Sequence, residues 1–235
     1  MDIDFMLDGI SAKSRGIILQ KPIEISALSP SLTSVKIAGR SGNVHIFDGT
    51  YESRTAVATC YCLGKDVSTV MSNVCEFLFG TFGERKLSTM DGYFYKAVIT
   101  NAAELHARLN MINPFTITFD CYPFRYLESG QSPQTIENGG VITNPTSLVS
   151  YPTISIDVQG EGTLTVNYNV FKINGLGYST TVVINSDKMN VSDTSGDLNT
   201  LVSWSKFPQL SPGDNAISWS GDINVLSIAP NWRSF

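Results

Sequence analysis

The sequence predicts a mainly β protein of two parts, and three observations lead to this prediction. Alternation of apolar and polar residues recurs through most of the chain. Clear helical spacing is found in residues 66–80. Beyond residue 128 the helical signal disappears, and short strands alternate with turn sequences rich in Gly, Ser, Asn and Asp. We therefore predict an N-terminal domain at residues 1–128 and a C-terminal domain at residues 129–235.

The first part begins with short alternating strands. Residues 22–26 and 34–38 alternate, and Arg40-Ser-Gly-Asn43 has the composition of a tight turn leading into residues 44–47. Residues 55–62 form a further strand. One face of that strand carries only small side chains, at Ala56, Ala58, Cys60 and Cys62. A face of this kind predicts that another element packs very close to it.

Residues 66–80 supply that element. Their apolar side chains recur at helical spacing in one stripe, at Val67, Val70, Met71, Val74, Phe77 and Leu78. Asp66 is the predicted N-cap and Gly80 the predicted stop. Burying six such side chains, at roughly 1.5–3 kcal/mol each, contributes on the order of 10 kcal/mol. We therefore expect the helix to be held by packing against the small-residue face.

The most regular strand lies in Asn113-Pro-Phe-Thr-Ile-Thr-Phe-Asp-Cys-Tyr-Pro-Phe-Arg-Tyr126. Its odd-numbered residues from Phe115 to Cys121 form one aromatic and aliphatic face, and its even-numbered residues form a polar one. Pro123 cannot donate to a ladder and is expected to close the strand. Residues 93–99 form a second strong strand. Residues 129 to about 150 have the composition of a linker or a loop-rich start of a domain.

Residues 151–235 are predicted to be all β. Ile154, Ile156 and Val158 alternate up to Gly160-Glu-Gly162, a hairpin sequence, and alternation resumes over residues 164–168. Further short strands follow, separated by Asn-Ser-Asp, Ser-Gly-Asp and Pro-Gly-Asp-Asn turns. Many short strands at this spacing predict a sandwich or jelly roll.

Composition argues against several functional classes. The chain has 16 basic and 21 acidic residues, so it lacks the basic face that duplex nucleic acid demands. No apolar run approaches the roughly 20 residues of a membrane helix, and the acidic start does not resemble a signal peptide. The cysteines lack the C-x-x-C spacing of a zinc site, so we expect reduced thiols in a reducing cytoplasm. These thiols are Cys60, Cys62, Cys75 and Cys121.

The sequence contains no arrangement that predicts catalysis. Neither histidine has metal-ligand spacing, and no P-loop, dinucleotide fingerprint or nucleophile elbow is present. The acids of the C-terminal half fall mostly at turns, where turn chemistry explains them. We therefore expect no enzyme, no metal and no cofactor. A degraded glycosidase or tail lysin is kept as a minor alternative.

Aromatic residues gather in the β-rich half, and exposed rings on a sandwich can stack on sugars. Trp204 and Trp219 are expected in the core, beside aliphatic strand residues. Tyr178, between Gly177 and Ser179, is expected to be exposed, while the setting of Trp232 stays open. Tyr178 and Trp232 are therefore the candidate contacts for a glycan or a protein partner.

Several segments, in order along the chain, resemble the distal tail protein family of long-tailed, non-contractile phages (siphophages). The mid-chain strand with its Pro-Phe-x-Tyr stop is the first sign. The other segments, with the short helix among them, are Gly39-Arg-Ser-Gly-Asn-Val44, Asp48-Gly-Thr-Tyr51, Asp91-Gly-Tyr-Phe-Tyr-Lys-Ala-Val98, Tyr151-Pro-Thr-Ile-Ser-Ile156 and Phe207-Pro-Gln-Leu-Ser-Pro-Gly-Asp-Asn-Ala-Ile217. The resemblance covers nearly the whole chain. It departs from the family at Phe77-Leu-Phe79, where members often have a tryptophan-containing helix.

The resemblance implies a role in the virion, at the phage tail tip. The N-terminal part would form a homohexameric ring, and the C-terminal part would be a β-sandwich similar to galectins and carbohydrate-binding modules. The ring, assembled in the host cytoplasm, would join the tail tube protein to the tail-tip fibre or tail-associated lysin and often to receptor-binding proteins. Arg40, Asn43, Tyr51 and Tyr93 would lie near ring contacts.

Other functions stay open beside this one. The main alternative is a carbohydrate-binding module that attaches to host cell-surface glycans, with Tyr178 in its platform. A different tail-tube-like structural protein would differ chiefly in forming stacked rings.

Overall fold

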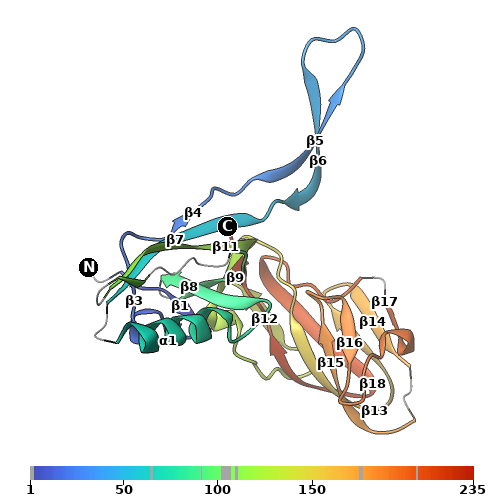
Figure 1. Cartoon of the computed structure of the whole chain (residues 1–235). Helices are drawn as coiled ribbons and strands as arrows, with labels where there is room; N and C mark the ends of the chain where they lie inside the picture. Colours follow the sequence, from blue (N-terminus) through green and yellow to red (C-terminus); the bar gives the residue numbers. More distant parts are fainter. Residues whose placement is uncertain are drawn as a thin grey trace. The chain divides into compact units, whose positions relative to one another are not determined.

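The computed structural model describes residues 3–63, 66–90, 92–101, 107–108, 111–174, 177–204 and 206–235. The chain divides into two compact units, Met1–Arg125 with Phe235 and Tyr126–Ser234. Both units are built mainly of β-strands, and the only α-helix among the described residues lies in the first (Figure 1). The predicted mainly β fold is therefore confirmed.

The first unit contains one main sheet, a separate two-stranded sheet and the helix. Along the main sheet the strands run in the order β2-β1-β8-β9-β11-β7-β3, with β4 also paired to β7 and β10 to β11. The 3-10 helix η1 (Lys13–Arg15) precedes β3, and α1 (Val67–Phe79) joins β7 to β8. The strands are β1 (Met6–Leu7), β2 (Ile10–Ser11), β3 (Ile17–Leu19), β4 (Glu24–Ile25), β5 (Pro30–Lys36), β6 (Asn43–Tyr51), β7 (Arg54–Leu63), β8 (Arg85–Met90), β9 (Tyr93–Ile99), β10 (Ala107–Arg108) and β11 (Met111–Leu127).

The core of the first unit lies between the main sheet and α1, which contacts β7 (Figure 1). Val74 and Leu78 of the helix are buried in the same cluster as the small-residue face of β7. The predicted packing of the helix is therefore confirmed. Burial raises the pKa of Cys60 to about 12 and that of Cys62 to about 11. Both side chains are therefore neutral thiols at physiological pH and pack as small apolar groups.

Polar contacts hold both ends of α1. The Asp66 side chain accepts hydrogen bonds from the backbone N–H groups of Ser68 and Thr69, as expected of an N-cap. At the other end the buried Arg85 guanidinium donates to the Phe77 carbonyl at 2.6 Å and to Asp8 Oδ2 at 2.7 Å. A cation at this end also complements the helix dipole. The predicted cap and the predicted stop near Gly80 are confirmed.

Strand β11 continues past the point where the sequence predicted its end. It runs through Pro123 to Leu127, whereas we expected Pro123 to close it. Its ladder to β7 ends at the Cys121–Arg54 pair, two residues before the proline. The missing N–H of Pro123 therefore removes no hydrogen bond from that ladder, and the extended backbone continues.

The second unit is built on one sheet in the order β12-β18-β13-β14-β17, with β15 pairing to both β13 and β16. Short 3-10 helices, η2 (Glu128–Gly130) and η3 (Asn199–Leu201), lie in its connections. The strands are β12 (Val141–Asn144), β13 (Thr153–Val166), β14 (Asn169–Ile173), β15 (Thr180–Asn185), β16 (Asn190–Ser192), β17 (Val202–Trp204), β18 (Gly213–Ala229) and β19 (Arg233–Ser234).

A bulge interrupts the pairing of β13 with β18, and the predicted hairpin at residues 160–162 is wrong. Between the Val158–Ile223 and Gly162–Gly221 pairs, residues 159–161 of β13 lie opposite Asp222 alone. A Cβ at Gly162 would lie 2.3 Å from the Ile223 side chain, so only glycine fits there. The glycines therefore mark the place where β18 packs very close to the backbone of β13, which continues as one long strand. The turn into β14 comes later, at residues 167–168.

The bulge divides the sheet of the second unit into two parts. Strand β15 pairs with the first part of β13, and β14 pairs with the second. Buried side chains from both parts, such as Ile156 and Leu164, belong to one core. The predicted sandwich is therefore a single curled sheet whose parts share a core, and its likeness to galectins stays a prediction.

Candidate interaction surfaces

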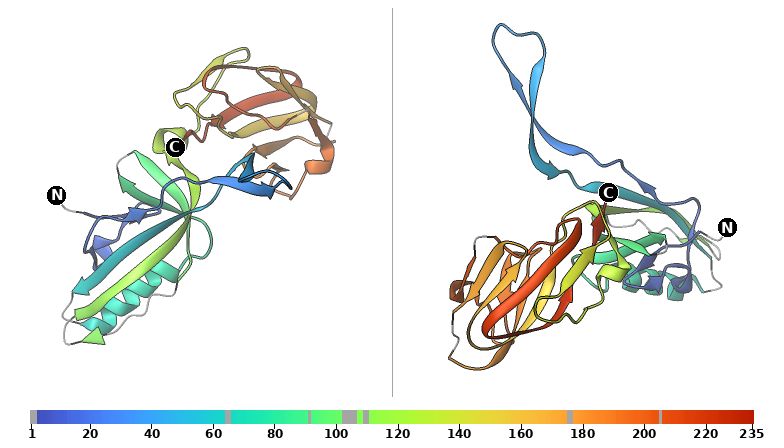
Figure 2. Two further views of the ribbon diagram at one scale, coloured as in Figure 1. Left: turned by 90° about the horizontal axis from the view of Figure 1, so that it is seen from above. Right: turned by 180° about the vertical axis from the view of Figure 1, so that it is seen from behind.

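Strands β5 and β6 form a hairpin that stands apart from the main sheet. They make a two-stranded sheet of their own, which extends away from the other strands of the first unit (Figure 1 and the right-hand view of Figure 2). At its tip the Arg40 N–H donates to the Ile37 carbonyl, and Gly39 has a φ of 77°. These features are those of a type II turn. The hydrogen-bonded turn therefore spans residues 37–40, whereas we predicted it at residues 40–43. The predicted hairpin is present, but its ladder ends at the Lys36–Asn43 pair, so residues 37–42 form the whole connection.

The hairpin exposes apolar side chains on both of its faces. Cross-strand partners share a face, so Leu32 lies beside Phe47 on one face and Thr33 beside Ile46 on the other. Two-stranded ribbons that are exposed on both faces are marginally stable in water, and clustered exposed apolar groups mark interaction sites. The hairpin surface, as we call it, consists of Leu32, Val35, Ile37, Ile46 and Phe47, each 39–53% exposed.

A turn within β6 shapes the root of the hairpin. Asp48 Oδ1 accepts hydrogen bonds from the Thr50 hydroxyl at 2.6 Å and from the Thr50 N–H at 2.8 Å. These bonds hold the pKa of the Asp48 carboxyl below its ordinary value. Gly49, between the two residues, has a φ of 89°, which favours glycine. The sequence Asp48-Gly-Thr50 is thus a structural turn.

Four aromatic rings meet where the hairpin joins the rest of the first unit. Tyr51 lies edge-on to Phe47, Phe124 and Phe235, with ring centroids 5.6, 5.4 and 6.1 Å away. Phe124 and Phe235 also contact each other, at 5.9 Å. We call these four residues the Tyr51 cluster.

The residues predicted near ring contacts lie in two places in the first unit. Arg40 and Asn43 are exposed at the hairpin tip, and Tyr51 is half-buried at its root. Tyr93 begins β9 in the main sheet, where the Arg125 guanidinium lies 4.5 Å from its ring centroid. The structure therefore brings three of the four residues onto the hairpin and leaves Tyr93 on another sheet.

Sequence reasoning missed the exposed apolar residues of the hairpin, although the pattern contained a signal. Residues 44–47 alternate so weakly that Ile46 and Phe47 are adjacent and both apolar. Adjacent residues of a strand point to opposite faces, so no single core can bury both. Such a pair in a predicted hairpin indicates that at least one of the two apolar side chains lies outside the core of its own unit.

In the second unit Tyr178 offers an exposed aromatic ring. Its side chain is 49% exposed, as expected, and its hydroxyl donates to Asp193 Oδ2 at 3.0 Å. That bond raises the pKa of Tyr178 above its ordinary value. Thr180 Oγ1 also donates to the same carboxylate oxygen, at 3.5 Å. The ring is therefore held in place rather than free to rotate.

The tryptophans differ in their settings. Trp232 is only 3% exposed and belongs to the core, so it offers no ring face to a glycan or a partner. Trp219 packs against the core and is partly buried, whereas Trp204 is 40% exposed, contrary to the expectation of a core residue. Trp204 lies on β17, at the edge of the sheet, and stacks on the buried Phe171 with centroids 5.8 Å apart. An edge position leaves its outer side uncovered.

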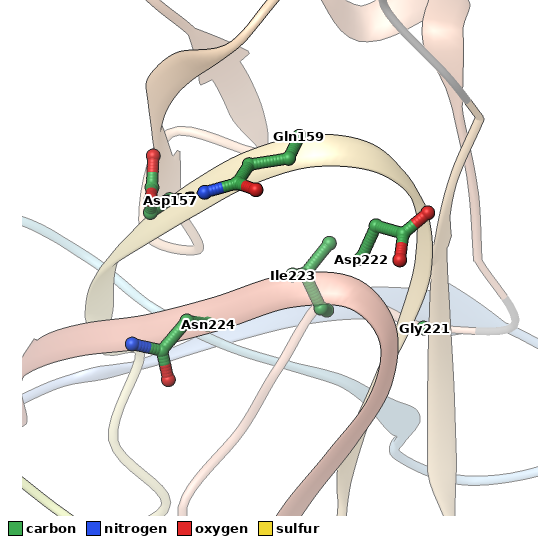
Figure 3. A pocket seen from close by; sticks show the side chains of 6 residues that line it. All are labelled: Asp157, Gln159, Gly221, Asp222, Ile223 and Asn224. Atoms are coloured by element: carbon green, nitrogen blue, oxygen red, sulfur yellow. Dashed lines mark hydrogen bonds between the residues drawn. The ribbon is translucent and has the colours of Figure 1, made fainter.

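A shallow polar pocket of about 200 Å³ lies at the bulge between β13 and β18. Figure 3 shows Asp157 and Gln159 of one strand beside Asp222 and Asn224 of the other. Gln159 donates to Asp157 across 3.5 Å, a weak bond. The residues that the structure describes contain no group of three or more His, Cys, Asp or Glu side chains suited to a metal ion. In that part of the chain, no helix is both long and apolar enough to span a bilayer.

Comparisons with known proteins show which proteins this chain is similar to. Residues 11–121, which contain the hairpin, α1 and most of the main sheet, match the family model of the phage tail protein RIFT-related domain. A search of curated proteins gives no match. The first unit is therefore similar to the RIFT-related domain of phage tail proteins.

One solved structure resembles this chain over nearly its whole length. It is the Dit protein (gp 19.1) of SPP1, described as a paradigm of hub adsorption apparatus in phages that infect Gram-positive bacteria. The two share 15% sequence identity with a TM-score of 0.63, and the match covers 96% of this chain and 98% of the SPP1 protein. The fold is thus shared. The resemblance to siphophage distal tail proteins that the sequence predicted is confirmed by both comparisons.

Proposed function

We propose that this chain is a structural component of a phage tail tip, where copies of it form a homohexameric ring. The observation that carries the proposal is the hairpin surface, which exposes apolar side chains on both faces of a projecting ribbon. A ring requires heterologous contacts, in which one patch of each copy meets a different patch of the next. A projecting ribbon suits such a contact because it can lie on a neighbouring copy.

The exposed residues of the hairpin surface would contribute to association. Covering the remaining exposed half of each of five side chains would contribute on the order of 1 kcal/mol per side chain. Each copy in a closed ring would place its hairpin on one neighbour and would receive the hairpin of the other neighbour. The ring would therefore gain stability from every junction at once.

The proposed ring also implies which proteins it contacts in the tail. We infer that the ring joins the tail tube protein to the tail-tip fibre or tail-associated lysin and carries receptor-binding proteins, as a hub in the virion. Support comes from the likeness to the SPP1 protein, which is described as a hub of the adsorption apparatus. A net charge of −5 also suits a hub whose channel must let DNA pass without holding it. Nothing in this role requires catalysis or a cofactor.

The ring can be tested with one substitution on the hairpin. At micromolar concentration in physiological salt, we expect the unchanged protein to form open-centred rings of about six copies, while Ile46→Asp stays monomeric. An aspartate at this position would place a charge in an apolar contact. Negative-stain electron microscopy and the mass in solution are the measurements. The matched control is Val170→Asp, an exposed valine on β14 of the second unit, which should still form rings. A monomeric mass for the unchanged protein would count heavily against the proposal.

The second unit supports carbohydrate binding as a second candidate function, because Asp193 holds the exposed Tyr178 ring in place. Such a ring presents apolar area to the C–H face of a sugar. If the unit binds a host saccharide, we expect a signal on a glycan array that Tyr178→Ala abolishes and Tyr178→Phe retains in part. Binding that is equal in the unchanged protein and Tyr178→Ala would exclude Tyr178 as the platform.

A further inference from the structure

The Tyr51 cluster points to a device that positions the hairpin. We propose that Phe124 and Phe235 clamp the Tyr51 ring and so fix the direction in which the hairpin leaves the first unit. We call the three rings of Tyr51, Phe124 and Phe235 the clasp. Phe235 is distant in sequence, since 184 residues separate it from Tyr51 along the chain. The clasp goes beyond the proposed ring because it acts within a single monomer, before assembly.

The root of the hairpin needs such a support because its ladder is interrupted there. Pro30 pairs with Tyr51 and Leu32 pairs with Phe47, so one residue of β5 lies opposite three residues of β6. These three residues are the turn Asp48-Gly-Thr50 described above. A bulge of this kind bends a ribbon and leaves backbone groups unpaired. Without a further contact, the root would be the natural hinge between the hairpin and the main sheet.

The aromatic rings span this weak point. Phe47 lies on the hairpin side of the bulge, Tyr51 lies just beyond it, and Phe124 belongs to β11 of the main sheet. The centroid distances of 5.4–6.1 Å and the interplanar angles of 63–73° are those of edge-to-face pairs. Phe235 contacts both Tyr51 and Phe124, which makes a closed triangle of rings. A triangle resists rotation of any one ring more than a single pair would.

Backbone bonds near the root do not replace the clasp. The Glu52 N–H donates to the Ser29 carbonyl, and the Thr55 N–H donates to the Ser26 hydroxyl, both at 2.9 Å. These bonds hold the two chains together below the bulge, on the side of the main sheet. At the bulge itself the Ser31 hydroxyl donates to Asp48 Oδ2 at 3.4 Å, a long bond, and the Phe47–Tyr51 ring contact spans the bulge.

The consequence for assembly rests on the proposed function. If the hairpin surface is the ring contact, a hairpin that already has its bound direction loses less freedom on binding. Substituting Phe235 should then raise the concentration needed for ring formation, although Phe235 does not belong to the hairpin surface. For Phe235→Ala we expect this concentration to rise about tenfold. For Phe235→Tyr we expect a concentration close to that of the unchanged protein.

The clasp itself is tested on separate molecules. A fluorescent label is placed at the hairpin tip through Ser41→Cys in the full chain, in a Cys75→Ser background because Cys75 is also exposed. The amplitude of tip motion is read from the decay of fluorescence anisotropy at nanomolar concentration, with the mass checked alongside. We expect Phe235→Ala and Tyr51→Ala each to increase that amplitude at least twofold. Tyr168→Ala, which removes a 98% exposed ring of the second unit, should leave it unchanged.

The outcomes separate the clasp from the ring. Equal tip motion in Phe235→Ala and the unchanged protein would overturn the clasp, whatever the protein does at high concentration. An unchanged protein that forms no ring, while Phe235→Ala still loosens the tip, would overturn the ring and leave the clasp standing. Phe235→Tyr keeps the ring of the side chain, so a loose tip in that variant would also count against the clasp.

Discussion

Replacing Asn215 with leucine is expected to lower the free energy of unfolding of the second unit by roughly 3–5 kcal/mol, because the five hydrogen bonds of this buried amide would be lost. In a unit of this size such a loss corresponds to a fall of roughly 10–20 °C in the midpoint of thermal unfolding.

The reason lies in the position of Asn215, which is fully buried on β18. Its Oδ1 accepts hydrogen bonds from the Ser211 N–H at 2.7 Å and from Asn167 Nδ2 at 2.9 Å. Its Nδ2 donates to the carbonyls of Ser211 and Gly213, both at 2.8 Å, and to that of Ile142 at 3.3 Å. One side chain thus joins β12, β18 and the turn between β13 and β14. Leucine has a similar volume but satisfies none of these groups.

Calorimetry or urea unfolding of the full chain measures the effect. Asn224→Leu is the matched control, since Asn224 lies on the same strand, is exposed, and should change the midpoint by no more than a few degrees. Equal stability of Asn215→Leu and Asn224→Leu would show that the buried amide network contributes little to the stability of the second unit.

Val74→Asp is expected to destabilise the first unit by roughly 4 kcal/mol or more, because the carboxylate would be buried without a partner. Val74 is fully buried on the inner face of α1, in the core that includes Ala58 and Cys60 of β7. The space beside that face is already filled by close-packed side chains. We therefore expect a protein that unfolds early or fails to stay soluble.

Ser72→Asp on the exposed face of the same helix is the control for Val74→Asp. It adds the same charge to α1 without burying it, so the thermal midpoint should move by only a few degrees. If Val74→Asp stayed soluble with an unchanged midpoint, the packing of α1 against β7 described above would be wrong.

Local patterns were enough to predict the elements of the first unit. The spacing of Val70, Val74 and Leu78 predicted α1, and the small residues of β7 predicted what it packs against. Both are local signals, because a helix repeats its apolar face within a few residues and a strand does so at every second residue. The hairpin connection at residues 37–42 was predictable to within a few residues for the same reason, since Gly39 and Gly42 are placed where a positive φ is needed.

Contacts between distant residues could not be predicted in this way. Gly160-Glu-Gly162 has the composition of a hairpin turn, but Ile223 and Asp222 of β18 determine that it is a bulge. Trp204 lies among apolar strand residues, yet it is exposed because β17 is at the edge of the sheet. In both cases the outcome depends on which strand lies alongside, and strand order is not encoded within a short window.

The same distinction between local patterns and distant contacts applies to the candidate surfaces. The mainly β class, the α-helix at residues 67–79 and the exposure of Tyr178 could be predicted, because each rests on residues that are neighbours in the chain. The three-dimensional structure was needed to show that the β5–β6 ribbon leaves the main sheet with apolar side chains exposed on both faces and that Trp232 is buried. The same holds for the meeting of Tyr51 with Phe235. Burial and ring contacts depend on which distant segments pack together, and the alternation of a strand is identical whether its outer face meets solvent, its own core or another copy.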